Sequence, residues 1–439
     1  NIWKIEELRN RILNTLLFLL IYRVGCHVVL PGVNPEALVV NREGGNDIMN
    51  LINMFAGGSF SRAAIFALGV MPYISASIVV QLLGIAVPAF QKMQKEGESG
   101  RKKMNNITRY LTVAITLVQA VAYVKTQISP EAKTLADPLF SILSAVVLTA
   151  GTLFVMWLGE KITDKGIGNG ISLIIMAGII AQLPAGITAE WASRMSPSGG
   201  GPIPLLLEFV ALFFVVIFTI LVVQGVRKIP VQYAKKIVGN KQIGGVRQYI
   251  PLKVNAAGVM PIIFAQAIMF LPMSLTQFFP NVQSDFLNSL SNYTSVTYNV
   301  VFALLIIAFT FFYTAIMVNP QQMSEDMKKN GGFIPGIKPG YETNLFIDNV
   351  ISHITFPGAV FVAIIAILPA IATLFGVNNQ FAHFYGGTSL LILVGVVLDT
   401  IQQIESHLLM RHYDGLMKTG RVKGRSTATT VEGYDQSAL

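Results

Sequence analysis

Long apolar runs recur along the 439-residue chain, separated by shorter polar stretches. A helix needs about 20 apolar residues to cross the hydrocarbon layer of a membrane, and ten runs meet or approach that length. The runs cover residues 12–30, 68–88, 107–126, 139–158, 170–185, 204–224, 252–273, 299–318, 350–373 and 387–409. The strands of a membrane barrel alternate in hydrophobicity, whereas these runs are apolar on every side. The pattern therefore predicts an all-α integral membrane protein with ten transmembrane helices.

Composition supports a membrane location and limits the chemistry. Hydrophobic residues make up 53% of the chain and charged residues 13%, with a mean hydropathy of +0.58, whereas soluble domains carry about 25% charged residues. The single cysteine, Cys26, excludes an internal disulfide, and no cluster of Cys and His offers metal ligands. We therefore expect neither a metal nor another cofactor.

Lys and Arg are concentrated in the segments that follow even-numbered spans. The segment 227–253 carries seven of them and no acidic residue, whereas 279–298 carries one charged residue, Asp285. Positively charged loops remain on the cytoplasmic side of a membrane. Both termini and the basic loops 227–253 and 320–349 are therefore predicted to be cytoplasmic, as is a tail at 411–439.

A six-residue motif occurs twice, as GVMPYI at 69–74 and GVMPII at 258–263. The copies lie in the second and seventh predicted spans, so they cross the membrane in opposite directions. This arrangement is typical of an inverted-topology repeat, with one half at 1–200 and the other at 201–410. Pro72 and Pro261 each remove a backbone donor and are predicted to kink their spans near the functional centre, although single proline kinks are common in membrane helices.

The sequence carries little sign of catalysis or of energy coupling. The central parts of the predicted spans carry few ionisable residues, which disfavours an ion-coupled transporter. The sequence contains no P-loop, HExxH or GxSxG motif, so an enzyme is not expected. A passive channel driven from outside, a transporter for a neutral solute and an interaction scaffold remain open.

The segment 51–69 is too polar to span a membrane and too apolar for a simple loop. It could form a short helix that is interrupted by Gly57 and Gly58 and carries Arg62. Such a helix could fold back into a pore mouth or lie along the membrane interface. Physical arguments alone slightly favour the interfacial helix.

Several long motifs resemble those of the SecY family, the channel subunits of the bacterial SecYEG translocon. They are MFAGGSFSRAAIFALGVMPYISASIVVQLL, KEGESGR, WLGEKITDKGIGNGISLII, PLKVNAAGVMPIIFA, NGGFIPGIKPG and YGGTSLLILVGVVLD. The resemblance covers essentially the whole chain. It implies two halves, helices 1–5 and 6–10, around a central hourglass pore. Unfolded polypeptides would cross this pore, and apolar segments would leave sideways between helices two and three and helices seven and eight.

The resemblance also implies roles for individual residues. Residues 53–63 would form a plug, replacing the interfacial-helix interpretation, with Asn53, Met54, Phe55, Gly57, Gly58, Phe60 and Arg62 as its main members. The pore ring would consist of Val70, Ile74, Ile171, Ile175, Met260, Ile263 and Ile392. Polar residues near a lateral gate would be Ser75, Gln81 and Asn169, although such groups also serve as simple contacts between membrane helices.

The basic loops would bind partners on the cytoplasmic face of the bacterial plasma membrane. Two short extended runs around Gly239 and Asn240 predict a hairpin, whose charges suit ribosomal RNA phosphates. The implied partners are SecE, SecG, the motor ATPase SecA, the ribosome, signal peptides, the translocating chain and lipids. The expected contact residues are Arg227, Lys228, Lys235, Lys236, Lys241, Arg247, Lys328, Lys329 and Lys338. Lys338 stands where family members commonly have Arg, whose bidentate geometry Lys cannot reproduce.

Overall fold

Ten helices account for most of the chain in the computed structural model. It describes residues 5–34, 53–128, 130–196, 200–233, 236–238, 241–243, 247–278, 289–290, 292 and 294–419. The ten helices are α1 (Glu6–Gly25), α4 (Met71–Ala86), α6 (Glu98–Gln127), α7 (Leu139–Lys165), α8 (Gly170–Arg194), α9 (Pro202–Gln224), α10 (Met260–Phe278), α12 (Val296–Met317), α14 (Tyr341–Leu374) and α16 (Gly387–Thr419). One helix therefore lies at each predicted span.

Not all ten helices are equally suited to cross a membrane. Within the described residues, seven are long and apolar enough, or eight if α4 and the short α5 (Pro88–Lys95) form one bent span. Charged residues such as Glu6, Arg9 and Arg11 occupy the first turns of α1. The helix α10 is not among the seven, because its apolar part, Met260–Met269, is shorter than a membrane span.

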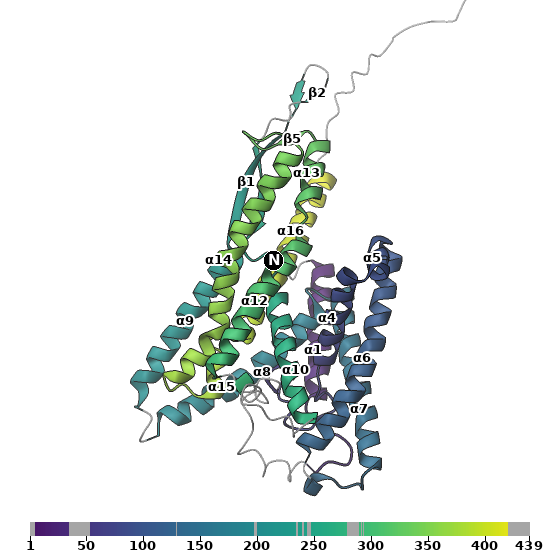
Figure 1. The fold of residues 1–439 in the computed structure, drawn as a ribbon, viewed down its shortest axis with the longest axis vertical. Coiled ribbons are helices and arrows are strands. Elements are labelled where there is room, and N and C mark those ends of the chain that lie inside the picture. The colour runs from purple at the N-terminus through teal and green to yellow at the C-terminus, as the bar shows by residue number, and fades with distance from the viewer. Residues whose placement is uncertain are drawn as a thin grey trace, which may run out of the picture.

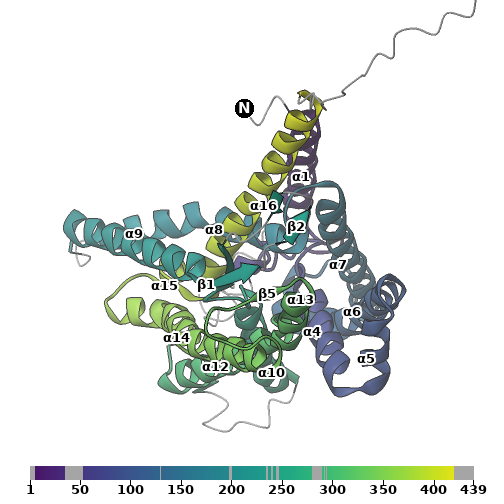
Figure 2. The same ribbon diagram turned by 90° about the horizontal axis from the view of Figure 1, so that it is seen from above.

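The packing order of the first five helices recurs in the second five. In the first half α4 packs on α6, α6 on α7 and α7 on α8. In the second half α10 packs on α12, α12 on α14 and α14 on α16. Viewed from above, the blue helices α4 to α7 and the green helices α10 to α14 form two groups, and the yellow α16 runs from beside α1 toward α8 (Figure 2). The chain crosses from one half to the other between α8 and α9, next to residue 200.

Small β-elements add to the expected all-α architecture. β1 (Val226–Tyr233) pairs antiparallel with β4 (Arg247–Lys253) and with β5 (Gly332–Phe333). β2 (Lys236–Val238) pairs with β3 (Lys241–Ile243), and Val238 faces Lys241 in this register. The predicted hairpin is therefore confirmed. It projects from the end of the molecule opposite α15 (Asn379–Ala382) (Figure 1).

A separate apolar cluster anchors this sheet to the helices. Ile229, Val231 and Leu252 from the sheet are buried with Met327 and Ile347. Met327 belongs to α13 (Pro320–Lys329) and Ile347 to the first turns of α14. The sheet of the basic loop 227–253 therefore packs on α13 and on the first turns of α14.

The two GVMP motifs begin helices, and the predicted proline kinks are wrong. Gly69 and Gly258 adopt positive φ angles of 54° and 65°, a conformation that glycine adopts without strain. The next helices start at Met71 and Met260, so Pro72 and Pro261 occupy first turns. Proline is favoured there because that backbone N–H has no partner within the helix. Each half thus brings a tight turn, followed by a helix start, to the centre of the molecule.

Candidate functional site

Six of the seven predicted ring residues meet in one apolar cluster. Val70, Ile175 and Ile392 are buried, with exposed fractions of 2%, 2% and 1%. Ile74, Ile171 and Ile263 are partly buried and pack against them. These residues come from α4, its preceding turn, α8, α10 and α16. Both halves therefore contribute to one apolar cluster, and we call these six residues the ring.

Met260 does not join the ring. Its side chain is 38% exposed, and it is the first residue of α10, where the helix begins. The preceding residue, Val259, packs against the ring cluster instead. A Cβ built on Gly395 of α16 would lie 2.4 Å from Val259 Cγ2, so these two helices approach closely there. The sequence did not single out Val259, because a β-branched residue beside a turn is too common to indicate a contact with the ring.

The predicted plug is buried beside the ring. Met54 and Phe55 are each 5% exposed and belong to the same cluster as Ile175 and Ile392. Phe60 lies in a neighbouring cluster and makes an edge-to-face contact with Tyr123 of α6, with 4.9 Å between ring centroids. This burial excludes the interfacial-helix interpretation, because the apolar side chains face the protein interior.

Hydrogen bonds to backbone carbonyls hold the plug in place. Arg23 Nη1 of α1 donates to Gly57 O at 3.0 Å, and Tyr123 OH donates to Phe60 O at 2.6 Å. Ser61 N donates to Asn53 Oδ1 at 3.0 Å within the segment. The plug is thus attached to α1 and α6 through groups that could rebond elsewhere if it moved.

Glycine makes the closest approach between the plug and α8. A Cβ on Gly178 would lie 2.8 Å from Phe55 O and 3.2 Å from Gly57 N. Real Cβ atoms do not occur at the shorter of these separations, so only glycine fits. The sequence offered no signal for Gly178, because its partner lies more than a hundred residues earlier in the chain.

A side-chain hydrogen bond crosses between the two halves at the predicted lateral gate. Tyr313 OH of α12 donates to Gln81 Oε1 of α4 at 2.5 Å. Phe264 of α10 packs against Tyr313 with 5.1 Å between ring centroids, and Ile78 of α4 joins this cluster. Gln81 therefore lies where a gate residue was expected, and Tyr313 is a partner that sequence inspection missed.

Ser75 and Asn169 differ from Gln81. Ser75 Oγ donates to Met71 O within its own helix at 3.2 Å. Asn169 caps α8, where its Oδ1 accepts from Ile171 N at 3.1 Å and from Ser172 N at 3.3 Å. The structure therefore does not bring Asn169 together with the other two predicted gate residues.

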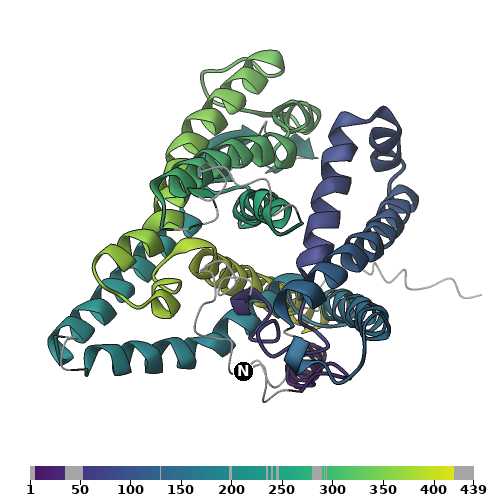
Figure 3. The same cartoon turned by 60° about the horizontal axis from the view of Figure 1, so that its bottom comes forward.

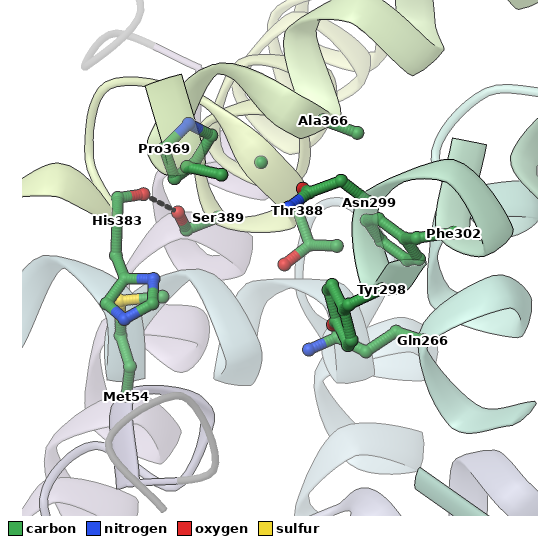
Figure 4. A pocket seen from close by; sticks show the side chains of 12 residues that line it. Met54, Gln266, Tyr298, Asn299, Phe302, Ala366, Pro369, His383, Thr388 and Ser389 are labelled. Atoms are coloured by element: carbon green, nitrogen blue, oxygen red, sulfur yellow. Dashed lines mark hydrogen bonds between the residues drawn. The ribbon is translucent and has the colours of Figure 1, made fainter. Parts of the chain in front are cut away.

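A small cavity separates the plug from the second half. Its volume is about 30 Å³, which is enough to hold a water molecule. Met54 lies next to His383 on one side, and the amide of Gln266 lies beside Tyr298 on the other (Figure 4). Gln266 Nε2 is buried without a hydrogen-bond partner among the described residues. The interface between plug and second half therefore includes polar groups as well as packed methyl groups.

A buried ionic cluster joins the halves where α8 meets α9. Arg194 donates to Glu190 Oε1 at 3.0 Å, to Gly376 O at 2.9 Å and to Glu208. Asn378 N donates to Glu190 Oε2 at 2.8 Å. The side chains of Glu190, Arg194 and Glu208 are 0%, 14% and 8% exposed. This cluster links α8 to α9 and to the connection between α14 and α15.

The basic residues predicted to bind partners are only partly described. Arg227 and Lys228 are exposed on β1, and Lys328 and Lys338 are exposed around β5. Lys329 is exposed as well and lies 4.0 Å from Asp326. The remaining predicted residues have side chains outside the described set; these are Lys235, Lys236, Lys241 and Arg247. Among the described residues, no group of His, Cys, Asp and Glu could hold a metal ion.

Curated proteins resemble the chain over nearly its whole length. A protein translocase subunit SecY from Staphylococcus carnosus is 41% identical over 429 residues, covering 94% of this chain and 98% of that protein. A protein with the same description from Thermotoga maritima is 40% identical over 440 residues, with 97% and 98% covered.

Solved structures share the fold at lower identity. A protein conducting channel superimposes with a TM-score of 0.67 at 16% identity, covering 94% of this chain and 95% of that one. A SecY structure whose plug domain is described as stabilising the closed state superimposes with a TM-score of 0.60 at 17% identity, with the same coverage. Sec61 in a canine ribosome-channel complex gives 0.63 at 15%, again covering 94% and 95%.

The helical fold, the paired GVMP turns and the apolar cluster shared by both halves agree with these similarities. The family profile described as SecY matches residues 64–401, which include α4 to α15, the first part of α16 and all six ring residues. The chain belongs to the SecY family, as a multi-pass membrane protein with the architecture of a protein-conducting channel.

Proposed function

We propose that this chain is the passive channel of a bacterial plasma-membrane translocase, which passes unfolded polypeptides through the ring. The observation that carries this proposal is the ring itself, because both halves contribute apolar side chains to one constriction with the plug packed beside it. All six ring residues are isoleucine or valine, so none of them carries an ionisable group. Such a waist excludes water without recognising a sequence.

Opening requires the plug to leave and the ring to widen. The carbonyl groups of Gly57 and Phe60 accept hydrogen bonds that water can replace once the plug reaches an aqueous vestibule. Isoleucine and valine side chains present no hydrogen-bonding groups to a passing chain. The ring can therefore fit around side chains of different shape without binding any of them.

Apolar segments of the translocating chain would leave the channel for the lipid bilayer through a seam. This seam has α4 on one side and α10 and α12 on the other. This seam holds the Gln81–Tyr313 hydrogen bond and the aromatic cluster around Phe264. An apolar helix of a signal sequence can replace the apolar contacts of that cluster with contacts of its own. A signal sequence that binds the open seam more tightly than the closed seam shifts the equilibrium between the two toward the open state.

Energy would come from partners bound to the basic loops. With both termini in the cytoplasm, exposed Arg227, Lys228, Lys328 and Lys338 face the compartment of SecA and the ribosome. A ribosome-bound complex among the similar structures supports this arrangement. SecE and SecG are proposed as the small membrane subunits, and the exposed apolar faces of α1 and α9 are available to them and to lipids.

Reconstitution distinguishes this function from solute transport. Vesicles containing the purified complex should import an unfolded secretory precursor when a motor ATPase and ATP are added, and not without them. Import should fall when the precursor is tightly folded beforehand, because the ring is narrow. Uptake of a neutral solute without any partner protein, together with no precursor import, would contradict the proposal.

A further inference from the structure

A second and larger cavity lies between the plug and both halves of the molecule. Its volume is about 310 Å³. The plug contributes one wall, α8 a second, and the segment from α15 to the start of α16 a third. Its polar lining residues include Asn53, Ser61, Arg62, Gln182 and Gln380. No acidic residue is among the described residues that line it.

Arg62 is the charged group of this cavity. Its Nη1 atom is buried without a hydrogen-bond partner among the described residues. A buried guanidinium nitrogen is costly to desolvate unless a partner of opposite charge or a carbonyl oxygen accepts its hydrogens. The cavity that Arg62 lines has room for such a partner, and none of the described residues that line it carries a negative charge.

The amide side chains around Arg62 can supply further donors. Gln182 lies directly over the plug, because a Cβ on Gly58 would be 2.4 Å from its Nε2 atom. Gln380 enters from the second half. A guanidinium and primary amides that line one cavity offer several hydrogen-bond donors, which suits an oxyanion because its oxygens accept several hydrogen bonds at once. A cation would be repelled by the positive charge of Arg62.

We propose that this cavity binds a small oxyanion of the phosphate or carboxylate class, with Arg62 as the charged ligand and Gln182 and Gln380 as neutral donors. A bound anion would bridge the plug to α8 and to the α15 segment, which lie in different halves. It would therefore bind the closed arrangement more tightly than any arrangement in which the plug has left. This consequence rests on the proposed role of the plug, whereas binding itself does not.

Binding can be measured directly on the complex reconstituted in lipid nanodiscs. Inorganic phosphate is titrated at constant ionic strength, with thermal unfolding and phosphorus NMR line width as readouts. We expect saturable binding that is at least about tenfold weaker in Arg62→Gln, because a hydrogen bond to a charged group is lost. Gln182→Leu, which keeps the charge, should weaken binding by a smaller factor. The matched control is Arg101→Gln, at an exposed arginine in the first turn of α6, and it should bind like the parent.

Phosphate binding that is absent, or unchanged in both Arg62→Gln and Gln182→Leu, would overturn the site. Its consequence is tested separately as resting ion conductance across planar bilayers. Phosphate on the plug side should lower conductance in the parent and not in Arg62→Gln. Binding without any effect on conductance would overturn the closed-state role and would count against the plug, while leaving the anion site in place.

Discussion

The two halves of the molecule meet at the ring and at two further contacts, which we call seams and which differ in chemistry. At one seam Arg194 joins Glu190, Glu208 and Gly376 O in a buried ionic cluster. At the other seam, α4 meets α10 and α12 through apolar and aromatic side chains and the neutral Gln81–Tyr313 hydrogen bond. Figure 3 shows α10, the teal-green helix near the centre, lying between the two groups of helices.

The difference indicates which seam opens. Removing one partner from a buried ion pair costs about 3–5 kcal/mol, whereas a neutral hydrogen bond contributes about 1 kcal/mol net. Apolar contacts at the second seam can also be replaced by lipid or by an apolar segment of a substrate. The halves should therefore separate at the α4 seam and pivot about the ionic seam.

The largest effect is expected when the ionic seam is broken. Arg194→Met leaves Glu190 and Glu208 buried without their cation, which should destabilise the fold by about 3–5 kcal/mol. Thermal unfolding in nanodiscs measures this loss. The control is Arg109→Met, because the Arg109–Glu160 pair has side chains that are 47% and 28% exposed and should contribute less than about 1 kcal/mol. Equal losses in the two variants would contradict the contrast between the seams.

A smaller effect is expected at the contact between α8 and the plug. Gly178→Ala places a Cβ about 2.8 Å from Phe55 O, and overpacking of this kind costs about 1–3 kcal/mol. If the plug moves away on opening, this cost destabilises only the closed arrangement. The open arrangement then becomes more populated, and resting ion conductance should rise. The control is Gly84→Ala, whose Cβ meets the flexible end of Gln94. A variant that is less stable but not leaky would show that the plug is a fixed part of the fold.

The α4 seam itself should respond more weakly. Tyr313→Phe keeps the aromatic ring and removes the donor to Gln81, which should favour the open seam by about 1 kcal/mol. Export of precursors with weakened signal sequences should therefore improve by less than about tenfold. Tyr110→Phe, at a side chain that is 75% exposed on α6, is the control. If export were unchanged in Tyr313→Phe, the hydrogen bond would not contribute to closure.

The smallest effect is expected from Ser75→Ala. Ser75 Oγ bonds to Met71 O within α4, so its loss leaves no partner unpaired in the other half. Signal-sequence stringency should remain within the error of the parent in the same export assay. A change as large as that of Tyr313→Phe would mean that Ser75 also bonds across the seam when the channel works.

Much of this architecture could be predicted from local sequence. Apolar runs predicted the ten helix positions, and the repeated GVMP motif predicted two halves of opposite direction. The same motif misled on detail, because a proline inside an apolar run signals a kink unless the positive φ of Gly69 or Gly258 is known. The conformation of a single glycine decides between these outcomes, and hydropathy does not report it.

Contacts between distant segments could not be predicted in the same way. Gly178 matters through Phe55, and Tyr313 through Gln81, yet neither residue stands out within its own helix. Arg194 is one charge at a helix end until Glu208 of the next helix is brought beside it. The ring residues were found by family resemblance, since isoleucine at helical spacing is equally typical of ordinary core packing.

The most direct test of the central claim asks where a translocating chain lies. In a Cys26→Ala background, single cysteines are introduced as Ile392→Cys in the ring and as Phe213→Cys, at a side chain that is 62% exposed on α9. A precursor with one cysteine is then arrested during motor-driven import and oxidised. The account predicts a disulfide between the precursor and residue 392 only while the precursor is arrested, and none at residue 213. Crosslinks at residue 213 with none at residue 392 would contradict it, because polypeptides would then cross outside the ring.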